Sequence, residues 1–353
     1  MNAEEITSVT FLTIIMTVSV IGNSLVILAT LISQNLRGFT NILIFNLSIS
    51  DLLITTVSLP IRMSQYFRTD TFSALSDCKI SVALTVFLFT STNMNLLLIT
   101  IDRFFGAVYP LKYRARTESR TTLVVGIFAS WTISLIIGTF PFFIYGEKDS
   151  VNDTRITVCT FSTVLKSGYV IFIEIGGLTV PWLIMITMYV KIFIVIYKSR
   201  HNKIRSSTNT NIIDLSRRKR SSQSNIVVQK IKRITHEIRL SKVVFIIVAF
   251  YSVCMVPIGL IDLIETINYE PLVPITVIKV ALLLAYANSA INPPIYAASS
   301  SKYRKHFYHL LCCFHIKQKR RQNRVSPANG VPLPNQHNTY RHSREVDTNL
   351  AIK

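Results

Sequence analysis

The sequence predicts an all-α membrane protein in which seven helices cross the bilayer and a short amphipathic helix follows the seventh. Half of the 353 residues are apolar and only 16% are charged. The mean hydropathy of +0.41 is too high for a soluble chain of this size. Seven apolar stretches approach or exceed the roughly 20 residues needed to cross hydrocarbon as a helix. Basic residues are concentrated in alternate connections, as expected for cytoplasmic loops.

The seven predicted spans contain very few charged residues. Asp51, Glu174 and Lys279 are the single charged residues of the second, fifth and seventh spans, and the other four spans contain none. The spans are 11–32, 41–61, 80–101, 121–145, 168–190, 243–261 and 272–296. We therefore expect the chain to divide into an extracellular N-terminus over 1–10, a bundle over 11–300, an amphipathic helix over 301–314 and a disordered cytoplasmic tail over 315–353.

The net charge of +20 reflects membrane topology. Thirty of the thirty-eight Lys and Arg residues lie in alternate connections or in the C-terminal tail. These segments are predicted to be cytoplasmic, which places the N-terminus outside and the C-terminus inside a plasma membrane that the chain crosses several times. The basic tracts lack interleaved aromatic residues for base stacking, so no nucleic-acid partner is expected.

The longest inner connection, about 198–240, is predicted to be partly disordered because its middle is polar, basic and rich in serine. Towards its end, apolar residues recur at helical spacing. The sixth helix is therefore expected to extend into the cytoplasm.

After the seventh span, basic residues alternate with aromatic residues and leucine in a pattern that gives a helix one apolar and one basic face. Such a helix is expected to lie along the lipid of the inner leaflet. Cys312 and Cys313 end it at a position where thiols are often palmitoylated. A structural role for the two cysteines is the alternative.

Asp51 lies in the middle of the second span, where an ionisable side chain is expected to face the interior of the bundle. Other polar residues occur at comparable depth in spans one, three and seven. Together they could hold a cation such as sodium, or they could form a structural hydrogen-bond network that binds no ion. The residues are Asn23, Thr92, Asn93, Asn288, Ser289 and Asn292.

Asp102 and Arg103 end the third span with adjacent opposite charges. Glu237 precedes Pro257 of the sixth span by twenty residues, about 30 Å along a helix, which brings it to the same inner level. Arg103 thus has two possible acidic partners and could exchange between them, as a two-state switch requires. Pro257 makes the sixth span the expected moving lever.

The cysteines and one glycosylation sequon are assigned to the outer side of the membrane. Cys78 and Cys159 both face the oxidising side, so a disulfide between them is expected. Asn152 begins an Asn-Asp-Thr sequon in the same outer loop as Cys159.

An ordered series of short motifs closely resembles the rhodopsin-like family of G-protein-coupled receptors. The resemblance extends from the first span to the amphipathic helix. The motifs are GN at 22–23, NLSISDLL at 46–53, DRF at 102–104, Trp131, Pro181 with Tyr189, CMVP at 254–257 and NPPIY at 292–296.

The resemblance implies a receptor that binds an extracellular small molecule or short peptide and activates a heterotrimeric G protein by outward movement of the sixth helix. Arg103 and Leu111 would contact the G protein, and Tyr189 and Tyr296 would swing inward to support the active state. Glu237 would hold Arg103 in the resting state, in which sodium would bind near Asp51. Arrestin, receptor kinases and membrane lipid are the further partners implied, and no organic cofactor is expected.

Two residues depart from the family pattern in the sixth span. Met255 replaces the usual tryptophan, and Tyr251 replaces the common phenylalanine four residues earlier. Methionine is slimmer and more flexible than indole, so the coupling from ligand to helix is expected to be looser.

The ligand remains unassigned. Thr85 stands where amine receptors carry an aspartate, which disfavours a classical monoamine, and Tyr286 stands where retinal binding needs a lysine. Glu174, Asp262 and other outer charges could bind a basic or zwitterionic ligand, or could be ordinary rim charges. The residues expected from position to line the pocket are Phe89, Ile173, Gly177, Ile258 and Tyr286.

Other function classes are less consistent with the sequence. A channel or transporter would need charged residues along a continuous path, yet Asp51 is nearly alone at mid-depth. An intramembrane enzyme would need paired catalytic groups or metal ligands, and none of the seven histidines falls within a span. An opsin-like protein is disfavoured by Tyr286. The chain is therefore not expected to be an enzyme.

Overall fold

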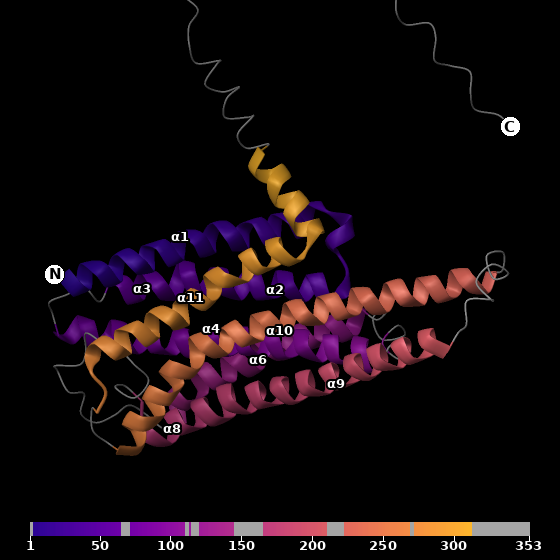
Figure 1. Ribbon diagram of the computed structural model, residues 1–353. Coiled ribbons are helices and arrows are strands. Elements are labelled where there is room, and N and C mark those ends of the chain that lie inside the picture. Colours follow the sequence, from indigo (N-terminus) through magenta and orange to yellow (C-terminus); the bar gives the residue numbers. More distant parts are fainter. Residues whose placement is uncertain are drawn as a thin grey trace, which may run out of the picture. The chain divides into compact units, whose positions relative to one another are not determined.

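The protein is a bundle of long helices that lie side by side (Figure 1). In this computed structural model, the described residues are 3–64, 71–109, 113, 120–144, 165–209, 222–268 and 272–312. Side chains are not described at 35, 71–77, 140–144, 199–209 and 222–239. The named helices are α1 (Ala3–Ile32), α2 (Phe39–Leu53), α3 (Leu59–Ser64), α4 (Thr71–Val108), α6 (Arg120–Ile144), α8 (Ser167–Ile171), α9 (Val180–Asn209), α10 (Ser222–Asn268) and α11 (Ile275–Ser299).

Within the described part of the chain, seven helical segments are long and apolar enough to cross a bilayer. They are Ala3–Ile32, Phe39–Ser64, Cys78–Val108, Arg120–Thr139, Ser167–Lys198, Leu240–Asn268 and Ile275–Ser299. The predicted fold class, an all-α bundle with seven spans, is therefore confirmed. α4 is central to the bundle because it packs against α2, α6, α9 and α10, whereas α1 packs against α2 and α11.

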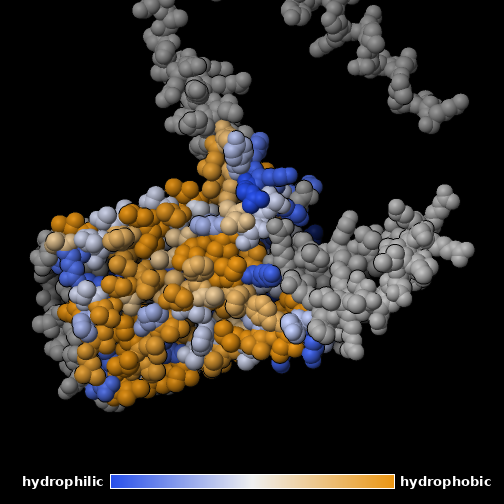
Figure 2. Space-filling model, in the orientation of Figure 1, coloured by the Kyte–Doolittle hydropathy of each residue, from blue (hydrophilic) through white to orange (hydrophobic). Residues whose placement is uncertain are grey.

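The surface of the bundle has the polarity that lipid requires. Apolar residues cover most of the face in Figure 2, and hydrophilic residues gather towards its two ends. Large apolar side chains on this surface are strongly exposed, such as Phe128 at 73% and Val253 at 63%. A soluble protein rarely exposes so much contiguous apolar surface. These side chains therefore face hydrocarbon.

The first helix starts earlier than the predicted span at 11–32. α1 begins at Ala3, so most of the segment expected as an N-terminal tail is helical. The carboxylate of Glu4 lies 3.5 Å from the ammonium group of Lys279 and accepts a hydrogen bond of 3.1 Å from Thr276. These contacts join the first turn of α1 to the outer end of α11.

Two π-helical turns each end two positions before a proline. The first, Ile54–Ser58, joins α2 to α3 just ahead of Pro60, and the second, Phe172–Thr179, joins α8 to α9 just ahead of Pro181. Proline removes a backbone donor and crowds the preceding turn, and a π turn widens the helix at that place. Spans two and five therefore continue across their prolines.

The fifth and sixth spans continue as helices beyond the bilayer. Span five ends at Lys198 while α9 runs to Asn209, and span six begins at Leu240 while α10 starts at Ser222. Figure 1 shows both helices extending past their neighbours at one end of the bundle. Residues 210–221 of the long inner connection lie outside the described residues.

A short helix over 301–312 follows α11. Tyr303 and Phe307 are buried, and the ring of Tyr303 contacts those of Tyr296 and Phe307 at centroid distances of 5.8 and 5.9 Å. Tyr308 and Leu311 are 72% and 54% exposed. Cys312 is a free thiol, and Cys313 lies outside the described residues.

Close approach of helices depends on glycine at two places. A Cβ added at Gly22 of α1 would lie 2.8 Å from the ring of Pro293 on α11, and one added at Gly138 of α6 would lie 2.7 Å from the Cα of Phe87 on α4. Neither contact leaves room for a methyl group. A Cβ at Gly126, also on α6, would lie 3.5 Å from Leu98, which is an ordinary contact.

We predict that Gly138→Ala destabilises the protein while Gly126→Ala does not. The alanine methyl at 138 must push α6 away from the backbone of α4, at a cost of about 1–3 kcal/mol. The thermal midpoint of the purified protein should fall by roughly 2–10 °C for Gly138→Ala and stay nearly constant for Gly126→Ala. Equal midpoints for the two variants would contradict the close packing of α4 and α6.

Candidate functional site

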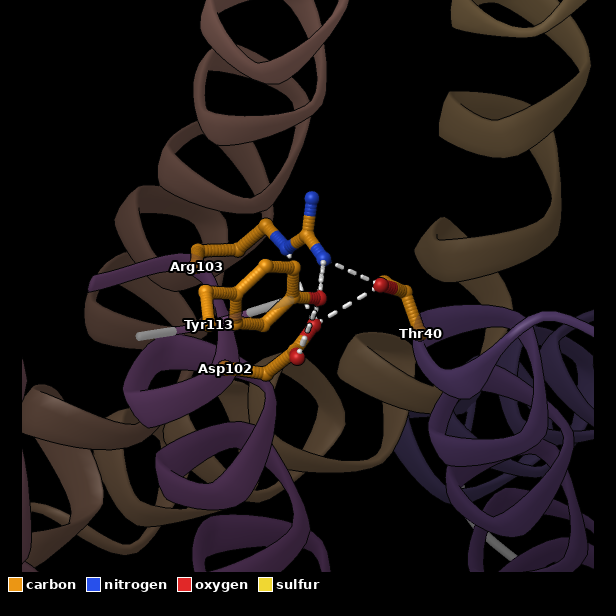
Figure 3. Close-up of polar contacts among 4 residues, drawn as sticks. All are labelled: Thr40, Asp102, Arg103 and Tyr113. Atoms are coloured by element: carbon orange, nitrogen blue, oxygen red, sulfur yellow. Dashed lines mark hydrogen bonds and ion pairs between the residues drawn. The ribbon is translucent and has the colours of Figure 1, made fainter. Parts of the chain in front are cut away.

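Four polar side chains converge at the inner end of α4 (Figure 3). The Arg103 guanidinium donates to the Asp102 carboxylate through Nε at 3.0 Å and through one terminal nitrogen at 2.5 Å. The same terminal nitrogen donates to the hydroxyls of Thr40 and, at 2.9 Å, Tyr113. Thr40 and Tyr113 in turn each donate to Asp102 at 2.7 Å. We call these four residues the inner cluster.

The inner cluster is almost completely buried at its charged centre. Arg103 is 1% exposed and Asp102 is 4% exposed. Desolvation of a buried ion pair is offset only when further hydrogen bonds satisfy the remaining donors and acceptors. The hydroxyls of Thr40 and Tyr113 supply such bonds, which makes the position of Arg103 dependent on α2 and on the segment after α4.

Sequence reasoning identified only part of this cluster. Asp102 was expected beside Arg103, but Thr40 and Tyr113 were missed because nothing in their local sequence distinguishes them. Glu237 lies on α10, but its side chain is outside the described part. Leu111 also lies outside the described residues.

A cavity adjoins the inner cluster. It has a volume of about 150 Å³ and is bounded by α2, α4, α6 and Tyr113. Asp102 and Tyr113 form part of its wall, and Phe39, Leu98 and Leu123 contribute apolar surface. The ring of Tyr113 therefore has unfilled space beside it.

Two tyrosines in the inner half of the bundle have buried hydroxyls. Tyr189 on α9 is 2% exposed and Tyr296 on α11 is 1% exposed. Neither hydroxyl has a hydrogen bond of normal geometry in the described structure, although Tyr189 lies near Thr100 and Arg103. Buried polar groups without partners are uncommon and call for an explanation.

The polar residues around Asp51 join spans one, two and seven. Asn292 donates to one carboxylate oxygen of Asp51 at 2.8 Å. Asn23 donates to the backbone carbonyl of Ser289 at 2.9 Å, and Ser19 donates to the same carbonyl at 3.2 Å. Asn288 is buried on the same helix as Ser289.

Several buried oxygens in this region have no hydrogen-bond partner in the described structure. They are Oδ1 of Asp51, Oδ1 of Asn23 and Oγ of Ser289, and Oγ1 of Thr92 on α4 is also buried without a partner. Oxygen atoms of this kind are the ligands that hard cations prefer. The donor set around Asp51 is therefore chemically suited to sodium, although the described residues contain no cluster of three or more His, Cys, Asp or Glu.

Other mid-membrane polar residues are bonded elsewhere. Asn95, which sequence reasoning did not single out, accepts from Asn46 at 2.5 Å and donates to Ser50 at 2.9 Å, and Trp131 donates to Asn46 at 3.0 Å. Asn93 donates to the backbone carbonyl of Gly177 at 2.9 Å. Asn93 thus bonds to the π-helical turn of span five and not to Asp51.

The structure contains a cavity in the outer half of the bundle, between α3, α4, the second π turn, α10 and α11. Six residues expected in the ligand pocket line it: Thr85, Phe89, Glu174, Ile258, Asp262 and Tyr286. The other lining residues are Arg62, Ser81, Val82, Leu178, Met255 and Leu282. We call this space the outer cavity.

Two residues expected in the pocket do not line the outer cavity. Ile173 packs in a separate apolar cluster with Cys78 and Tyr169. Gly177 lies against Ile137 of α6. Both residues belong to the second π turn, whose wider winding changes which side chains face the centre of the bundle.

Hydrogen bonds between three spans form part of the wall of the outer cavity. Ser58, at the end of the first π turn, lies 2.9 Å from the Thr85 hydroxyl and 3.3 Å from the Tyr286 hydroxyl. Phe89 contacts the Tyr286 ring edge-on at 5.5 Å. The cavity volume is about 20 Å³, which is room for about one water molecule. A larger ligand therefore requires side chains to move.

The remaining predicted residues lie on α10 or near the outer rim. Met255 lines the outer cavity, Tyr251 is buried one turn further in, and Pro257 lies within the continuous helix. Cys78 is disulfide-bonded. Cys159 and Asn152 lie outside the described residues.

Comparison with known proteins gives consistent matches. Residues 22–296 match the family model described as 7 transmembrane receptor (rhodopsin family). The alpha-1A adrenergic receptors of Mus musculus and Homo sapiens are 31% and 30% identical over 312 residues, covering 83% of this chain and 65% of each relative. The adenosine receptor A2b of Homo sapiens is 26% identical over 346 residues, covering 91% of this chain and 96% of the relative.

The chain thus spans about 65% of the length of its adrenergic relatives. The family match, in contrast, includes most of the chain, from Gly22 in α1 to Tyr296 in α11. The matched residues include those of the inner cluster, the polar region around Asp51 and the outer cavity. This chain belongs to the rhodopsin family of seven-transmembrane receptors.

Proposed function

We propose that this protein is a plasma-membrane receptor that binds an extracellular small molecule or short peptide in the outer cavity and activates a heterotrimeric G protein at its inner face. The observation that carries the proposal is the buried Asp102–Arg103 pair held by Thr40 and Tyr113. Family membership supports the receptor class, and receptors of this family are not enzymes.

In the resting state, Arg103 is bound within the inner cluster and is not available to a cytosolic partner. Activation would break the contacts to Tyr113 and Thr40 and turn the guanidinium towards the G protein, with Leu111 adding an apolar contact. Glu237 would be a second acidic partner for Arg103 in the resting state. Because the buried pair is costly in isolation, a modest change in its surroundings can shift the balance between the two states.

The sixth span would connect the outer cavity to the inner cluster. Met255, Ile258 and Asp262 all line the outer cavity from α10, and Pro257 lies between Met255 and Ile258. α10 is 47 residues long, so a small tilt at the proline becomes a large displacement at its inner end. The hydroxyls of Tyr189 and Tyr296 have no hydrogen bond in the described structure. They would find hydrogen-bond partners once the inner end of α10 moves outward.

A hydrogen bond between spans five and six supports this route. The Trp182 indole donates to the Ser252 hydroxyl at 2.7 Å, one turn inward from Met255. The indole that the family usually carries on the sixth span is absent, so span five supplies one at a nearby level. Outward movement of α10 would either break this hydrogen bond or move Trp182 together with Ser252.

Sodium is the proposed allosteric ion of the resting state. Asp51, Asn23, Thr92 and Ser289 offer the buried unbonded oxygens, and Asn292 and Asn288 lie on the same wall of the bundle. The bound ion would neutralise the buried charge of Asp51 and hold spans two and seven together.

Further partners and modifications follow from the same proposal. The N-terminus and the outer loop containing Asn152 and Cys159 would be extracellular, with Cys159 as the disulfide partner of Cys78. The C-terminus would be cytoplasmic. Arrestin and receptor kinases would act at the inner face, and the helix over 301–312 would rest on membrane lipid, with Cys312 and Cys313 as palmitoylation sites.

We predict that Arg103→Gln abolishes G-protein activation. The amide cannot replace the charged, multiply bonded guanidinium at the inner face. The measurement is nucleotide exchange on purified G protein by receptor in lipid nanodiscs, with equal amounts of folded protein. Undiminished exchange by this variant would refute the proposed coupling role of Arg103.

We predict that Tyr113→Phe raises agonist-independent exchange. Loss of a hydroxyl bonded to both charges removes about 1.5–3 kcal/mol of resting-state stabilisation, which is roughly a 10- to 100-fold shift in the equilibrium. Tyr109→Phe is the matched control, because Tyr109 is 46% exposed and its side chain makes only ring contacts in the described structure. Equal basal exchange in the two variants would exclude Tyr113 from the resting state.

We predict that sodium chloride, but not potassium chloride, raises the thermal midpoint of the parent receptor. Asp51→Asn should abolish this difference because a neutral amide does not supply the ionic ligand. The measurement is the unfolding midpoint in detergent at constant ionic strength. A midpoint that responds equally to both cations would favour a structural hydrogen-bond network without an ion.

A further inference from the structure

We propose that the ligand of this receptor carries a positive charge, as a protonated amine or guanidinium, and that its counter-ion is Glu174 on span five, supported by Asp262 on span six. This inference rests on the proposed function and assigns the ligand class of the outer cavity. In amine receptors of this family, the acidic counter-ion is expected on the third span. Here it would lie on the fifth span instead.

Glu174 has the burial and the free acceptor that such a role needs. Its side chain lines the outer cavity and the residue is only 5% exposed. In the described structure, Oε1 of Glu174 is buried and accepts no hydrogen bond. An unpaired carboxylate oxygen inside a membrane protein is costly, so it calls for a partner that the described residues do not supply.

The backbone around Glu174 is adapted to bring this carboxylate into the bundle. Glu174 belongs to the π turn Phe172–Thr179, a form of helix that is frequent at functional sites. Its second oxygen, Oε2, lies 2.7 Å from the point where a Cβ on Gly259 would sit. Glycine at this position of α10 therefore leaves the space that the carboxylate occupies.

The charges of the outer cavity favour a cation. Two carboxylates, Glu174 and Asp262, and one guanidinium, Arg62, line it, for a formal net charge of −1. Burial disfavours the charge of Glu174, and the nearby carboxylate of Asp262 adds to that cost. Arg62 and Asp262 each have further interactions within the protein, whereas Oε1 of Glu174 accepts no hydrogen bond. A monovalent cation beside Glu174 would relieve the repulsion and balance the charge.

The third span offers no alternative counter-ion within the described cavity wall. Its lining residues are Ser81, Val82, Thr85 and Phe89, all uncharged. The Thr85 hydroxyl already lies within hydrogen-bond distance of Ser58 and Tyr286. The cavity volume of about 20 Å³ also suits a group the size of an ammonium ion. The charged end of the ligand would therefore enter first, and the remainder would require side chains to move.

The first test needs no ligand. Glu174→Gln keeps the shape of the side chain and removes the charge that repels Asp262, so the ligand-free thermal midpoint should rise by roughly 2–5 °C. Glu4→Gln is the charge-matched control at the outer end of α1, where the midpoint should not rise. A lower midpoint for Glu174→Gln than for the parent would mean that Glu174 is a structural residue, and would overturn the proposal.

The second test measures binding of defined probes to the purified full-length receptor. Tyramine, noradrenaline and arginine methyl ester serve as cations, and 2-phenylethanol and adenosine as uncharged compounds. At least one cation should raise the thermal midpoint of the parent, and Glu174→Gln should weaken its apparent affinity about thirtyfold or more. Thr85→Asp introduced into Glu174→Gln should restore binding, because it returns a carboxylate to the same cavity.

The outcomes separate this inference from the proposed function. Each cation is tested at 10 mM, which is roughly a hundredfold excess over a dissociation constant of about 100 μM. The inference is overturned if no cation shifts the thermal midpoint of the parent. It is also overturned if the midpoint of Glu174→Gln responds to the cation as the parent does. Undiminished nucleotide exchange by Arg103→Gln would instead remove the proposed function. Binding of an uncharged probe alone would leave the receptor class intact and exclude a cationic ligand.

Discussion

A guanidinium and a carboxylate that share a buried site at the inner end of α4 constrain much of this structure. Arg103 and Asp102 are adjacent in sequence, but their mutual attraction alone does not compensate for the loss of water. The hydroxyls of Thr40 and Tyr113 complete their coordination, which requires α2 and the segment after α4 to meet at this point. A charge pair that depends on neutral neighbours in this way can be stable in one arrangement and released in another.

The bundle combines rigid and adjustable segments around that pair. α4 packs against α2, α6, α9 and α10 and has no proline, so it provides a fixed reference for the others. Spans two and five carry π turns that end two positions before Pro60 and Pro181, and these turns accommodate the prolines without ending the helices. α10 instead runs through Pro257 without such a turn. The missing donor of Pro257 leaves a weaker place in the very helix that connects the outer cavity to the inner face.

The outer cavity is small because hydrogen bonds and aromatic contacts draw its walls together. Ser58, Thr85 and Tyr286 link spans two, three and seven, while Glu174 from span five reaches towards Gly259 of span six. The first set is satisfied within the protein, whereas one oxygen of Glu174 has no hydrogen-bond partner among the described residues. In our proposal, this asymmetry directs the ligand towards the fifth and sixth spans. A ligand bound there would act directly on α10, since Met255, Ile258 and Asp262 line the same space.

The sequence by itself determined the fold class and the approximate position of every span, and it singled out Asp51, Asp102 and Arg103, which are buried in the structure. Apolar length and unpaired charge in a bilayer are local properties, so they can be read without knowing how helices pack. Only the tertiary structure decided which polar groups meet. Thr40 bonds to Asp102 across 62 residues and Ser58 approaches Tyr286 across 228. The π turn likewise directed Glu174, but not Ile173 or Gly177, into the outer cavity. Such contacts depend on the rotation and separation of neighbouring helices, which long-range packing sets and local sequence does not encode.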